Sequence, residues 1–430
     1  MKTIEQKTSI LVDCEQEVNI AEEEQPPSPW GEVTKQEWED WHWQLAHRIQ
    51  TVDQLRQVIS LSDEEQEVLS HSLNALRMAI TPYYASLMDP DDPHCPIRLR
   101  AIPTMSETHL AHEDMDDPLH EDVDSPVKGL THRYPDRVLM LLSDQCAMYC
   151  RHCTRRRLAG EKDQARTTDE YDAMIDYVRE HPGIRDVILS GGDPLTMSTQ
   201  RLESVISRLR EIPHVEIIRI GTATPAVMPM RITDELVAML KRYQPIWINT
   251  HFNHPKELTP EAAEALARLV DGGIVVGNQN VLLKGVNDCP YILKELFQHL
   301  VKLRVRPYKM YQCDLSQGIG HFRTSIAKGI GIMEHLIGHT SGIAIPEYVV
   351  DLPGGGGKVP VNPRYMISQG ERVVLFRNYA GKIYKYVEPE DTTPSRCPEN
   401  CTICHDRKMR GLDQEQIGLA RLLDTDEIML

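Results

Sequence analysis

Short apolar, β-branched runs alternate with longer amphipathic stretches through the middle of the chain. The runs predict strands at 138–143, 186–190, 216–220, 246–250, 274–277 and 307–312. The stretches between them predict helices, among them 170–180, 200–211, 234–243 and 260–270. Strands alternating with helices indicate βα units on a parallel sheet. Because six units are two fewer than a closed eight-stranded barrel needs, we expect an α/β fold built on a partial (β/α)6 barrel.

The flanking composition suggests four regions. Residues 1–35 are acidic and read as an arm or linker, and 36–130 as an N-terminal helical region followed by a connector. The partial barrel should occupy 131–355, and 356–430 a C-terminal, metal-binding extension. His109, His112 and His120 lie among carboxylates in the Pro- and Asp-rich stretch 87–130. They could trap a metal, but a solvated connector is the favoured interpretation.

Chemically unusual segments follow the predicted strands. They are 146–153, 190–194, 221–225, 251–254, 279–280 and 313–314. Ligand and catalytic groups in parallel α/β folds collect at the carboxyl edge of the sheet. The sequence therefore predicts a functional site at that edge.

Charge and cysteine content limit the class of protein. With 47 Lys and Arg against 64 Asp and Glu, the net charge of −17 argues against a nucleic-acid or anionic-membrane partner. No apolar run approaches the roughly 18–20 residues that span a bilayer, and the N-terminus lacks a secretory signal, so a cytoplasmic protein is expected. In a reducing compartment, clustered cysteines hold metal or do redox chemistry more often than they form disulfides.

Cys146, Cys150 and Cys153 form the most specific motif. Four thiolates normally hold a [4Fe–4S] cluster, so three would leave one iron open. The amino and carboxylate groups of S-adenosylmethionine suit that iron, and electron transfer could then release a carbon radical. The alternatives are a zinc site or ordinary buried thiols.

Four glycines, Gly354 to Gly357, precede Lys358. Glycines let a backbone approach a ligand closely, and a lysine amine can form a Schiff base with an aldehyde cofactor. By itself the run favours a flexible surface turn, and it lacks the spacing of a phosphate-binding P-loop.

These motifs together carry a family resemblance. The C-x3-C-x2-C element and Gly191-Gly192-Asp193 resemble the radical S-adenosylmethionine superfamily. With the segments 132–137, 251–255, 313–316 and 351–358, the chain from about His132 to Cys404 resembles the lysine 2,3-aminomutases. The resemblance implies a [4Fe–4S] cluster, S-adenosylmethionine and pyridoxal 5′-phosphate used together on a partial barrel.

The resemblance also implies residue roles. Lys358 would anchor pyridoxal phosphate, with Arg133, Tyr134 and Arg137 around it, unless those three form only a surface salt-bridge face. Arg155 would hold the substrate α-carboxylate, and Asp314 and Asp351 its side-chain ammonium, although an aspartate at a strand end is as often a helix cap. The S-adenosylmethionine residues would be Gly191, Gly192, Asp193, His251 and Gln279, the last two being equally explained as ordinary polar core groups.

A second cysteine group lies near the C-terminus. Cys397, Cys401 and Cys404, with Cys289, supply the four soft ligands of a closed zinc site. The resemblance implies a structural zinc shared between subunits, and hence a homo-oligomer, dimer or tetramer. A second iron–sulfur cluster is the alternative, and Cys397 is the weakest ligand because its spacing is wider than the family pattern.

The expected function is radical conversion of L-lysine to L-β-lysine (3,6-diaminohexanoate), with an unidentified electron donor. Three alternatives remain open at this point. One is an aminomutase for another amino acid, such as glutamate, and one is a shorter relative that makes β-lysine to modify a translation factor. The cysteines at 397–404 argue against the shorter relative. The third is a non-catalytic iron–sulfur or zinc scaffold.

Overall fold

A single curved sheet forms the centre of the protein. The structure is a computed structural model that describes residues 30–62, 65–66, 69 and 77–393. Strands β2 to β8 are parallel to their neighbours, while β1 and β9 pair antiparallel at the two edges. The strands are β1 (Leu130–Tyr134), β2 (Arg137–Ser143), β3 (Asp186–Gly191), β4 (Ile217–Gly221), β5 (Ile246–Thr250), β6 (Val275–Leu282), β7 (Arg306–Gln312), β8 (Glu347–Leu352) and β9 (Gly357–Pro360).

The predicted open barrel is confirmed, with one more parallel strand than the sequence indicated. Strands β2 to β7 correspond to the six expected runs, and β8 is the addition. It was missed because the helix before it contains Gly329 and Gly331, which weaken a helical pattern. Gly329 is there for packing, since a Cβ at this position would lie 2.2 Å from the ring of Tyr348 on β8.

A side chain brings the two edges of the sheet together. The hydroxyl of Tyr134 on β1 accepts a hydrogen bond of 2.9 Å from the backbone N–H of Lys358 on β9. The sheet is therefore nearly closed into a barrel, with one side-chain contact where strand pairing stops.

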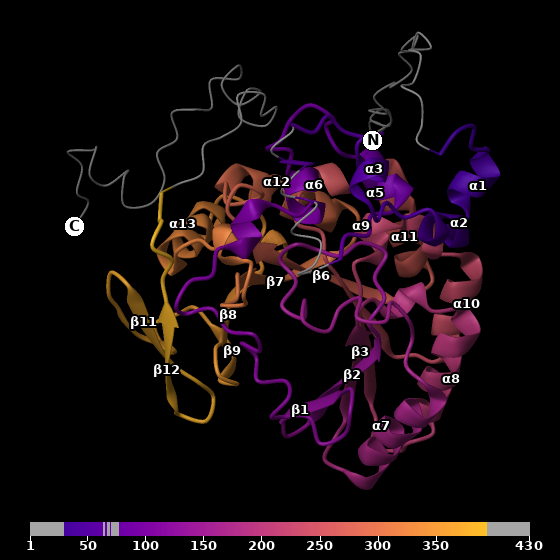
Figure 1. The fold of residues 1–430 in the computed structure, drawn as a ribbon. Coiled ribbons are helices and arrows are strands. Elements are labelled where there is room, and N and C mark those ends of the chain that lie inside the picture. The colour runs from indigo at the N-terminus through magenta and orange to yellow at the C-terminus, as the bar shows by residue number, and fades with distance from the viewer. Residues whose placement is uncertain (1–29, 63–64, 67–68, 70–76, 394–430) are drawn as a thin grey trace, which may run out of the picture.

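Helices cover the outer surface of the sheet (Figure 1). The buried residues of α7 are Tyr171, Met174, Ile175 and Val178, the spacing of one apolar helix face. A capping box between Thr167 and Glu170 begins this helix. The helices of this layer are α7 (Thr168–Glu180), α8 (Thr199–Arg210), α9 (Thr224–Val227), α10 (Asp234–Arg242), α11 (Pro260–Asp271), α12 (Pro290–Lys302) and α13 (Ile326–Leu336), with 3-10 turns η2 (Pro194–Thr196), η3 (Pro229–Arg231), η4 (Pro255–Glu257), η5 (Gly320–Phe322) and η6 (Gly342–Ala344).

Short N-terminal helices pack onto the loops that follow the central strands. Thr81 donates a hydrogen bond of 2.5 Å to the carbonyl of Val227, after β4, and Tyr84 donates one of 2.9 Å to Glu257, after β5. These helices are α1 (Lys35–Glu39), α2 (Trp41–Ala46), α3 (Val52–Leu55), α5 (Pro82–Ser86) and α6 (Pro96–Ala101), followed by η1 (Met105–Thr108). Helix α6 lies in the stretch expected to be loop, because its proline occupies the first helical turn, where no N–H is needed.

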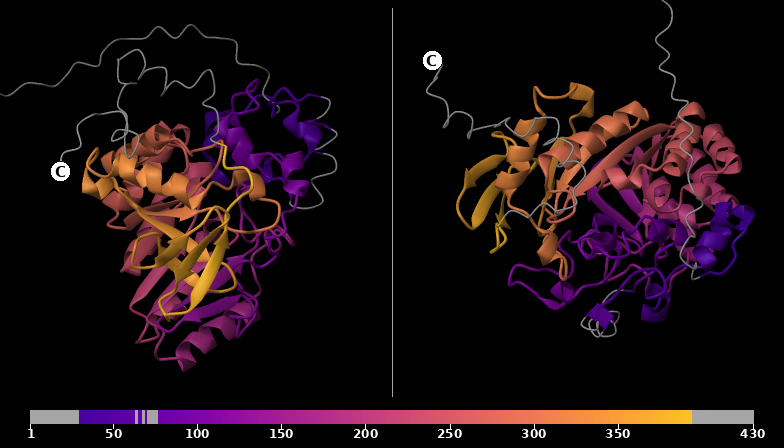
Figure 2. Two further views of the ribbon diagram at one scale, coloured as in Figure 1. Left: turned by 90° about the vertical axis from the view of Figure 1, so that its left-hand side faces the viewer. Right: turned by 90° about the horizontal axis from the view of Figure 1, so that it is seen from above.

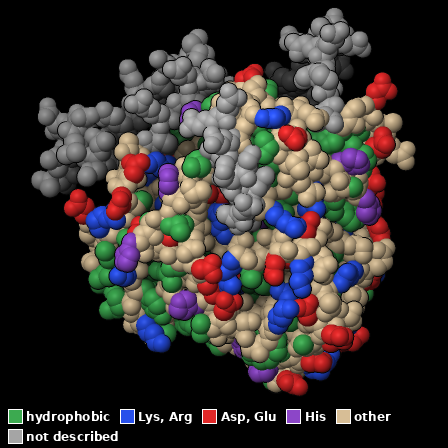
Figure 3. Space-filling model, in the orientation of Figure 1, with side chains coloured by type: hydrophobic (Ala, Val, Ile, Leu, Met, Phe, Trp, Pro, Cys, Tyr) green, Lys and Arg blue, Asp and Glu red, His purple; other side chains and the backbone are tan. Residues whose placement is uncertain are grey.

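A separate three-stranded antiparallel sheet follows β9. It consists of β10 (Met366–Gln369), β11 (Val373–Arg377) and β12 (Ile383–Val387), and Figure 2 shows it face-on in the left-hand view. Its buried side chains pack against β8 through Leu352, and the Tyr386 hydroxyl donates to the carbonyl of Cys313, just after β7. Apolar side chains gather on the outer surface of this region in Figure 3, where Ile367 and Ile383 are exposed.

Two further predictions from the sequence can be compared with the structure. Gln279 and Asn280 lie within β6 rather than after it, because β6 continues past a register shift and stays paired with β7 to Leu282. The expected division at residues 355 and 356 falls between β8 and β9, which pair in one sheet, and the domain division stays a prediction.

Within the described ranges, no helix has the length and apolar character to cross a membrane.

The close approach of β3 to β2 gives a test of the fold. Gly191 has φ +131°, and a Cβ there would lie 2.2 Å from the carbonyl oxygen of Ser143. We expect Gly191→Ala to lower the free energy of unfolding by roughly 2–3 kcal/mol, since both backbone and packing are strained. Gly331→Ala is the control, because nothing lies within 4 Å of its added methyl group and the helix should gain up to about 1 kcal/mol. Equal thermal unfolding curves for the two variants would contradict this prediction.

Candidate functional site

The segment with Cys146, Cys150 and Cys153 follows β2 and is attached to the N-terminal helices through its backbone. The N–H of Tyr149 donates to the carbonyl of Ala79 at 3.1 Å, and the N–H of Arg151 to the carbonyl of Arg100 at 2.8 Å. We call residues 146–153 the cysteine loop. These two hydrogen bonds, together with the preceding strand β2, hold the loop at the carboxyl edge of the sheet.

The three thiols influence one another electrostatically. Burial raises the pKa of each, and the negative charges of Asp193, Cys153 and Cys150 raise the pKa of Cys146 further. Thiolates this close are stable only if a cation offsets their mutual repulsion. The donor set therefore fits a positively charged iron centre.

No group of three or more His, Cys, Asp or Glu side chains in the described part of the chain is arranged to hold a single metal ion. His109, His112 and His120 are among the described residues, and their role in the connector stays a prediction. The cysteines of an iron–sulfur cluster bind different irons, so their sulfurs stand farther apart than the ligands of one ion.

Gly191-Gly192-Asp193 packs directly on the cysteine loop. The N–H of Gly192 donates to the carbonyl of Ser143 at 2.5 Å, and that of Asp193 to Gln145 at 2.7 Å. The buried Asp193 carboxylate accepts hydrogen bonds only from its own chain, with donors Leu195, Thr222, Ala223 and Thr224. Its side chain therefore organises two loops, and the backbone carbonyl of Asp193 accepts hydrogen bonds from the N–H and the hydroxyl of Thr196.

His251 and Gln279 lie together and extend toward β7. Gln279 Nε2 and His251 Nε2 are 3.1 Å apart, and the Tyr311 hydroxyl donates to Gln279 Oε1 at 3.5 Å. Burial, helped by the charges of Arg100 and Arg155, lowers the pKa of His251 to about 4. His251 is consequently neutral at physiological pH and can accept as well as donate a hydrogen bond.

Lys358 lies next to Asp351 in the β8–β9 pair. Its Nζ forms an ion pair with Asp351 Oδ2 and lies 5.7 Å from the ring centre of Tyr311. Burial would lower the pKa of Lys358, but the charges of Asp351, Tyr311 and Tyr134 raise it above its ordinary value. Lys358 is therefore an ammonium group here, and its side chain is 42% exposed.

The residues expected around Lys358 are beside it. Besides the Tyr134 contact described above, the Arg137 guanidinium lies 3.8 Å from the centre of the Tyr134 ring. A Cβ at Gly357, where φ is +83°, would come within 2.9 Å of the Tyr134 hydroxyl, so glycine is required there. Arg133 is paired with Asp124 at 2.7 Å, which holds its guanidinium in the same region.

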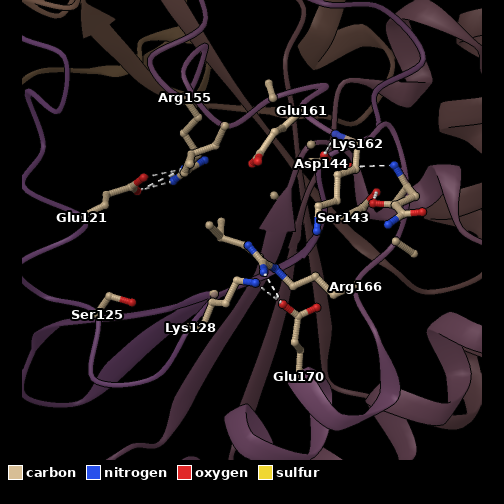
Figure 4. Close-up of a pocket in the computed structure, with 18 of the residues that line it drawn as sticks. Glu121, Ser125, Lys128, Ser143, Asp144, Arg155, Glu161, Lys162, Arg166 and Glu170 are labelled. Atoms are coloured by element: carbon tan, nitrogen blue, oxygen red, sulfur yellow. Dashed lines mark hydrogen bonds and ion pairs between the residues drawn. The ribbon is translucent and has the colours of Figure 1, made fainter.

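Arg155 borders a cavity of about 490 Å³ that also includes Gly191 and Gly192 (Figure 4). Its Nε and Nη2 form a two-pronged ion pair with Glu121, with distances of 2.7–3.1 Å. Burial would lower the pKa of Arg155, but Glu121 raises it above its usual value. Sequence reasoning missed Glu121, because it lies in the acidic connector where nothing distinguishes it from its neighbours.

Asp314 and Asp351 form an incompletely neutralised pair. Burial, and then the charge of Asp351, raise the pKa of Asp314 to about 8. Among the described residues, Asp351 Oδ1 is buried without a hydrogen-bond partner. Lys358 is one ammonium beside two acidic groups, so a second cation at this place would favour ionisation of Asp314.

Known proteins share these features over nearly the whole chain. The radical SAM superfamily model matches residues 140–292, and the lysine-2,3-aminomutase model matches residues 333–430. An L-lysine 2,3-aminomutase of Clostridium subterminale is 55% identical over 399 residues, covering 93% of this chain and 94% of that protein. The chain belongs to the lysine 2,3-aminomutase family.

Two further relatives agree in activity class. An L-lysine 2,3-aminomutase of Fusobacterium nucleatum is 58% identical over 365 residues, covering 85% of this chain and 86% of that protein. A glutamate 2,3-aminomutase of Clostridioides difficile is 46% identical over 352 residues, covering 82% and 83%. The protein is thus an isomerase, a radical S-adenosylmethionine aminomutase, and the scaffold alternative is excluded.

The C-terminal cysteines of this aminomutase cannot be placed beside Cys289. Cys289 caps the N-terminus of α12, whereas Cys397, Cys401 and Cys404 lie outside the described residues. The zinc site therefore stays a prediction.

The raised pKa of Asp314 predicts how the stability of the ligand-free aminomutase depends on pH. The folded state favours the protonated carboxyl, so stability should fall as pH rises from about 4, its ordinary range, to about 8. Between pH 6 and 8 we expect the wild type to lose roughly 1–2 kcal/mol more than Asp314→Asn. Urea unfolding at both pH values measures this difference, and parallel losses in the two proteins would refute the prediction.

Proposed function

We propose that this aminomutase converts L-lysine to L-β-lysine by moving the amino group from the α- to the β-carbon. The single observation that carries this proposal is the Asp314–Asp351 pair. Asp351 has a buried oxygen without a partner among the described residues, and a cation brought between the two groups would favour the ionised form of Asp314. Charged hydrogen bonds of this kind contribute about 1.5–3 kcal/mol each. A glutamate side chain would bring a third carboxylate to the same place.

The Lys358 side chain is an example of the group that the Asp314–Asp351 pair would bind. Its alkylammonium at Asp351 is the same chemical group as the side-chain end of a lysine substrate. The relatives named for L-lysine are also more similar to this chain than the one named for glutamate, at 55% and 58% against 46% identity.

The same proposal assigns the cofactor residues. The cysteine loop would hold a [4Fe–4S] cluster, and the carbonyls of Gly191 and Gly192, with His251 and Gln279, would border S-adenosylmethionine. When bound, these two groups supply a carbon radical, and pyridoxal phosphate supplies an aldehyde that carries the migrating nitrogen. Arg133, Tyr134 and Arg137 would surround its phosphate, since guanidinium groups form strong charged bonds to phosphate.

Lys358 and Asp351 would act as a proton-exchanging pair. An ammonium cannot react with an aldehyde, so Lys358 must first lose a proton. Asp351 Oδ2, which contacts Nζ, is the nearest acceptor. Once Lys358 has left and Asp351 has released that proton to solvent, the Asp351 carboxylate is free to bind the substrate ammonium.

Arg155 would hold the substrate α-carboxylate. Glu121 engages its Nε and Nη2, while Nη1 makes no hydrogen bond within the described residues. Glu121 thus fixes the plane of the guanidinium and leaves one donor for the substrate.

Three further assignments belong to this proposal. Cys289, Cys397, Cys401 and Cys404 would bind a structural zinc between the subunits of a homo-oligomer. A separate reductant would supply the electron for the cluster. The thiol groups suit the reducing cytoplasm as the place of action.

Trapping with borohydride tests the anchor. After incubation with pyridoxal phosphate and reduction, peptide mass spectrometry should find the label on Lys358 and lose it in Lys358→Arg. Lys309→Arg is the matched control, because Lys309 is also ion-paired on the sheet, to Glu347. Undiminished labelling of Lys358→Arg would rule out the anchor role.

Turnover of a panel of amino acids tests the substrate. Anaerobically reconstituted protein, with S-adenosylmethionine and reductant, should form β-lysine from L-lysine and little product from L-glutamate. Asp314→Asn should reduce kcat/KM for lysine by about 10–150-fold, the equivalent of one charged hydrogen bond. The control Asp172→Asn removes only a surface ion pair. Preferential turnover of glutamate by the wild type, or unchanged lysine turnover in Asp314→Asn, would refute the lysine assignment.

A further inference from the structure

A buried arginine lies against the cysteine loop. Arg100, on α6, is 0% exposed. Its carbonyl accepts the 2.8 Å hydrogen bond from Arg151, which stands between Cys150 and Cys153. The backbone of Arg100 is therefore fixed directly beside two of the three cysteines.

Only part of the Arg100 side chain is satisfied. Nη1 donates to the Tyr84 hydroxyl at 2.9 Å and to the carboxylate of Glu257, which is also 0% exposed. Nε and Nη2 are buried and meet no acceptor at ordinary hydrogen-bond distance and angle among the described residues, although the guanidinium lies near enough to the Cys150 thiol to interact with it. Buried donors are nearly always paired in native proteins, so two unpaired donors on one guanidinium point to a missing acceptor.

The charge of Arg100 reaches the cysteines. Burial raises the pKa of the Cys150 thiol, and the Arg100 guanidinium opposes that rise. The same guanidinium adds to the effect of burial in lowering the pKa of His152 and of His251. The charge of Arg100 thus affects ionisable groups on both the cysteine loop and the loop after β5.

Glu257 explains how an arginine can be kept in this position. Its other oxygen accepts hydrogen bonds from the N–H groups of Asn253 and His254, at 2.6 and 3.0 Å. The carboxylate is thereby fixed to the loop after β5, and it neutralises the guanidinium while orienting it through Nη1. The remaining edge of the guanidinium stays available to an anionic group.

We propose that Arg100 donates hydrogen bonds from Nε and Nη2 to sulfur atoms of the iron–sulfur cluster and so favours its reduced state. Reduction adds one negative charge to the cluster, and donors to its sulfurs stabilise that charge. This inference rests on the proposed function, because it requires the cysteine loop to hold the cluster. Arg100 is a positioning and tuning residue, not a ligand of iron.

Arg100→Lys provides the test, since lysine keeps the positive charge beside Glu257 but lacks the second pair of donors. The cluster-loaded protein is titrated electrochemically without S-adenosylmethionine, and the reduced cluster is counted by electron paramagnetic resonance. We expect the ratio of reduced to oxidised cluster at a fixed potential to fall at least tenfold, which equals 59 mV for one electron. Arg98→Lys is the matched control, because Arg98 is a buried arginine of the same helix whose guanidinium donates to the carbonyl of Pro90 at 3.1 Å, and its ratio should change less than threefold.

A second measurement uses the wild type alone. Guanidino-¹⁵N arginine is incorporated into the wild type, and pulsed electron paramagnetic resonance spectra of the reduced cluster should show a coupling to this nitrogen. This measurement tests the contact between an arginine and the cluster even if Arg100→Lys fails to hold a cluster. An unchanged ratio in cluster-loaded Arg100→Lys, or no coupling in the wild type, would overturn the role of Arg100 and leave the proposed function intact. A wild type that binds no cluster would refute the proposed function, and this inference with it.

Discussion

Parallel pairing of β2 to β8 is the constraint on which the site depends. Parallel neighbours must point their carboxyl ends at the same edge, so segments separated by hundreds of residues meet there. The cysteine loop after β2 and Asp314 after β7 are both at that edge because of this pairing. The antiparallel addition of β9 then turns the chain back and places Lys358 opposite Asp351. Sheet topology, rather than any local motif, therefore assembles the site.

Charge balance is the second principle of the site. Each strong charge near the edge has a partner that limits the cost of burial: Glu257 for Arg100, Glu121 for Arg155 and Asp351 for Lys358. Exceptions among the described residues include Oδ1 of Asp351 and the Nε and Nη2 donors of Arg100. Unpaired buried groups are costly, so a site tends to retain them where a ligand will pair with them. In this protein the exceptions match an ammonium substrate and an electron-rich cluster.

The N-terminal helices contribute both to the loops at the sheet edge and to the charge balance there. Tyr84 and Arg100 both bind Glu257, so the helices before the barrel contribute to the loop after β5. The cysteine loop is hydrogen-bonded to the same helices. The N-terminal helical region, which the sequence shows only as helices and a connector before the barrel, is consequently part of the electrostatic environment of the site.

The sequence by itself determined the alternation of strands and helices, the carboxyl-edge location of the site and the family. These features depend on periodicity and on motifs that are contiguous in the chain, such as the cysteine loop and the glycines before Lys358. The tertiary structure alone decided the seventh parallel strand, the helix that carries Arg100 and the pairing of Glu121 with Arg155. Each of these depends on a contact between distant segments: Gly329 against Tyr348, Arg100 against Glu257, and a connector carboxylate against a guanidinium beyond the cysteine loop. Local pattern cannot encode such contacts, because their energy comes from burial and charge pairing that exist only after the chain has folded.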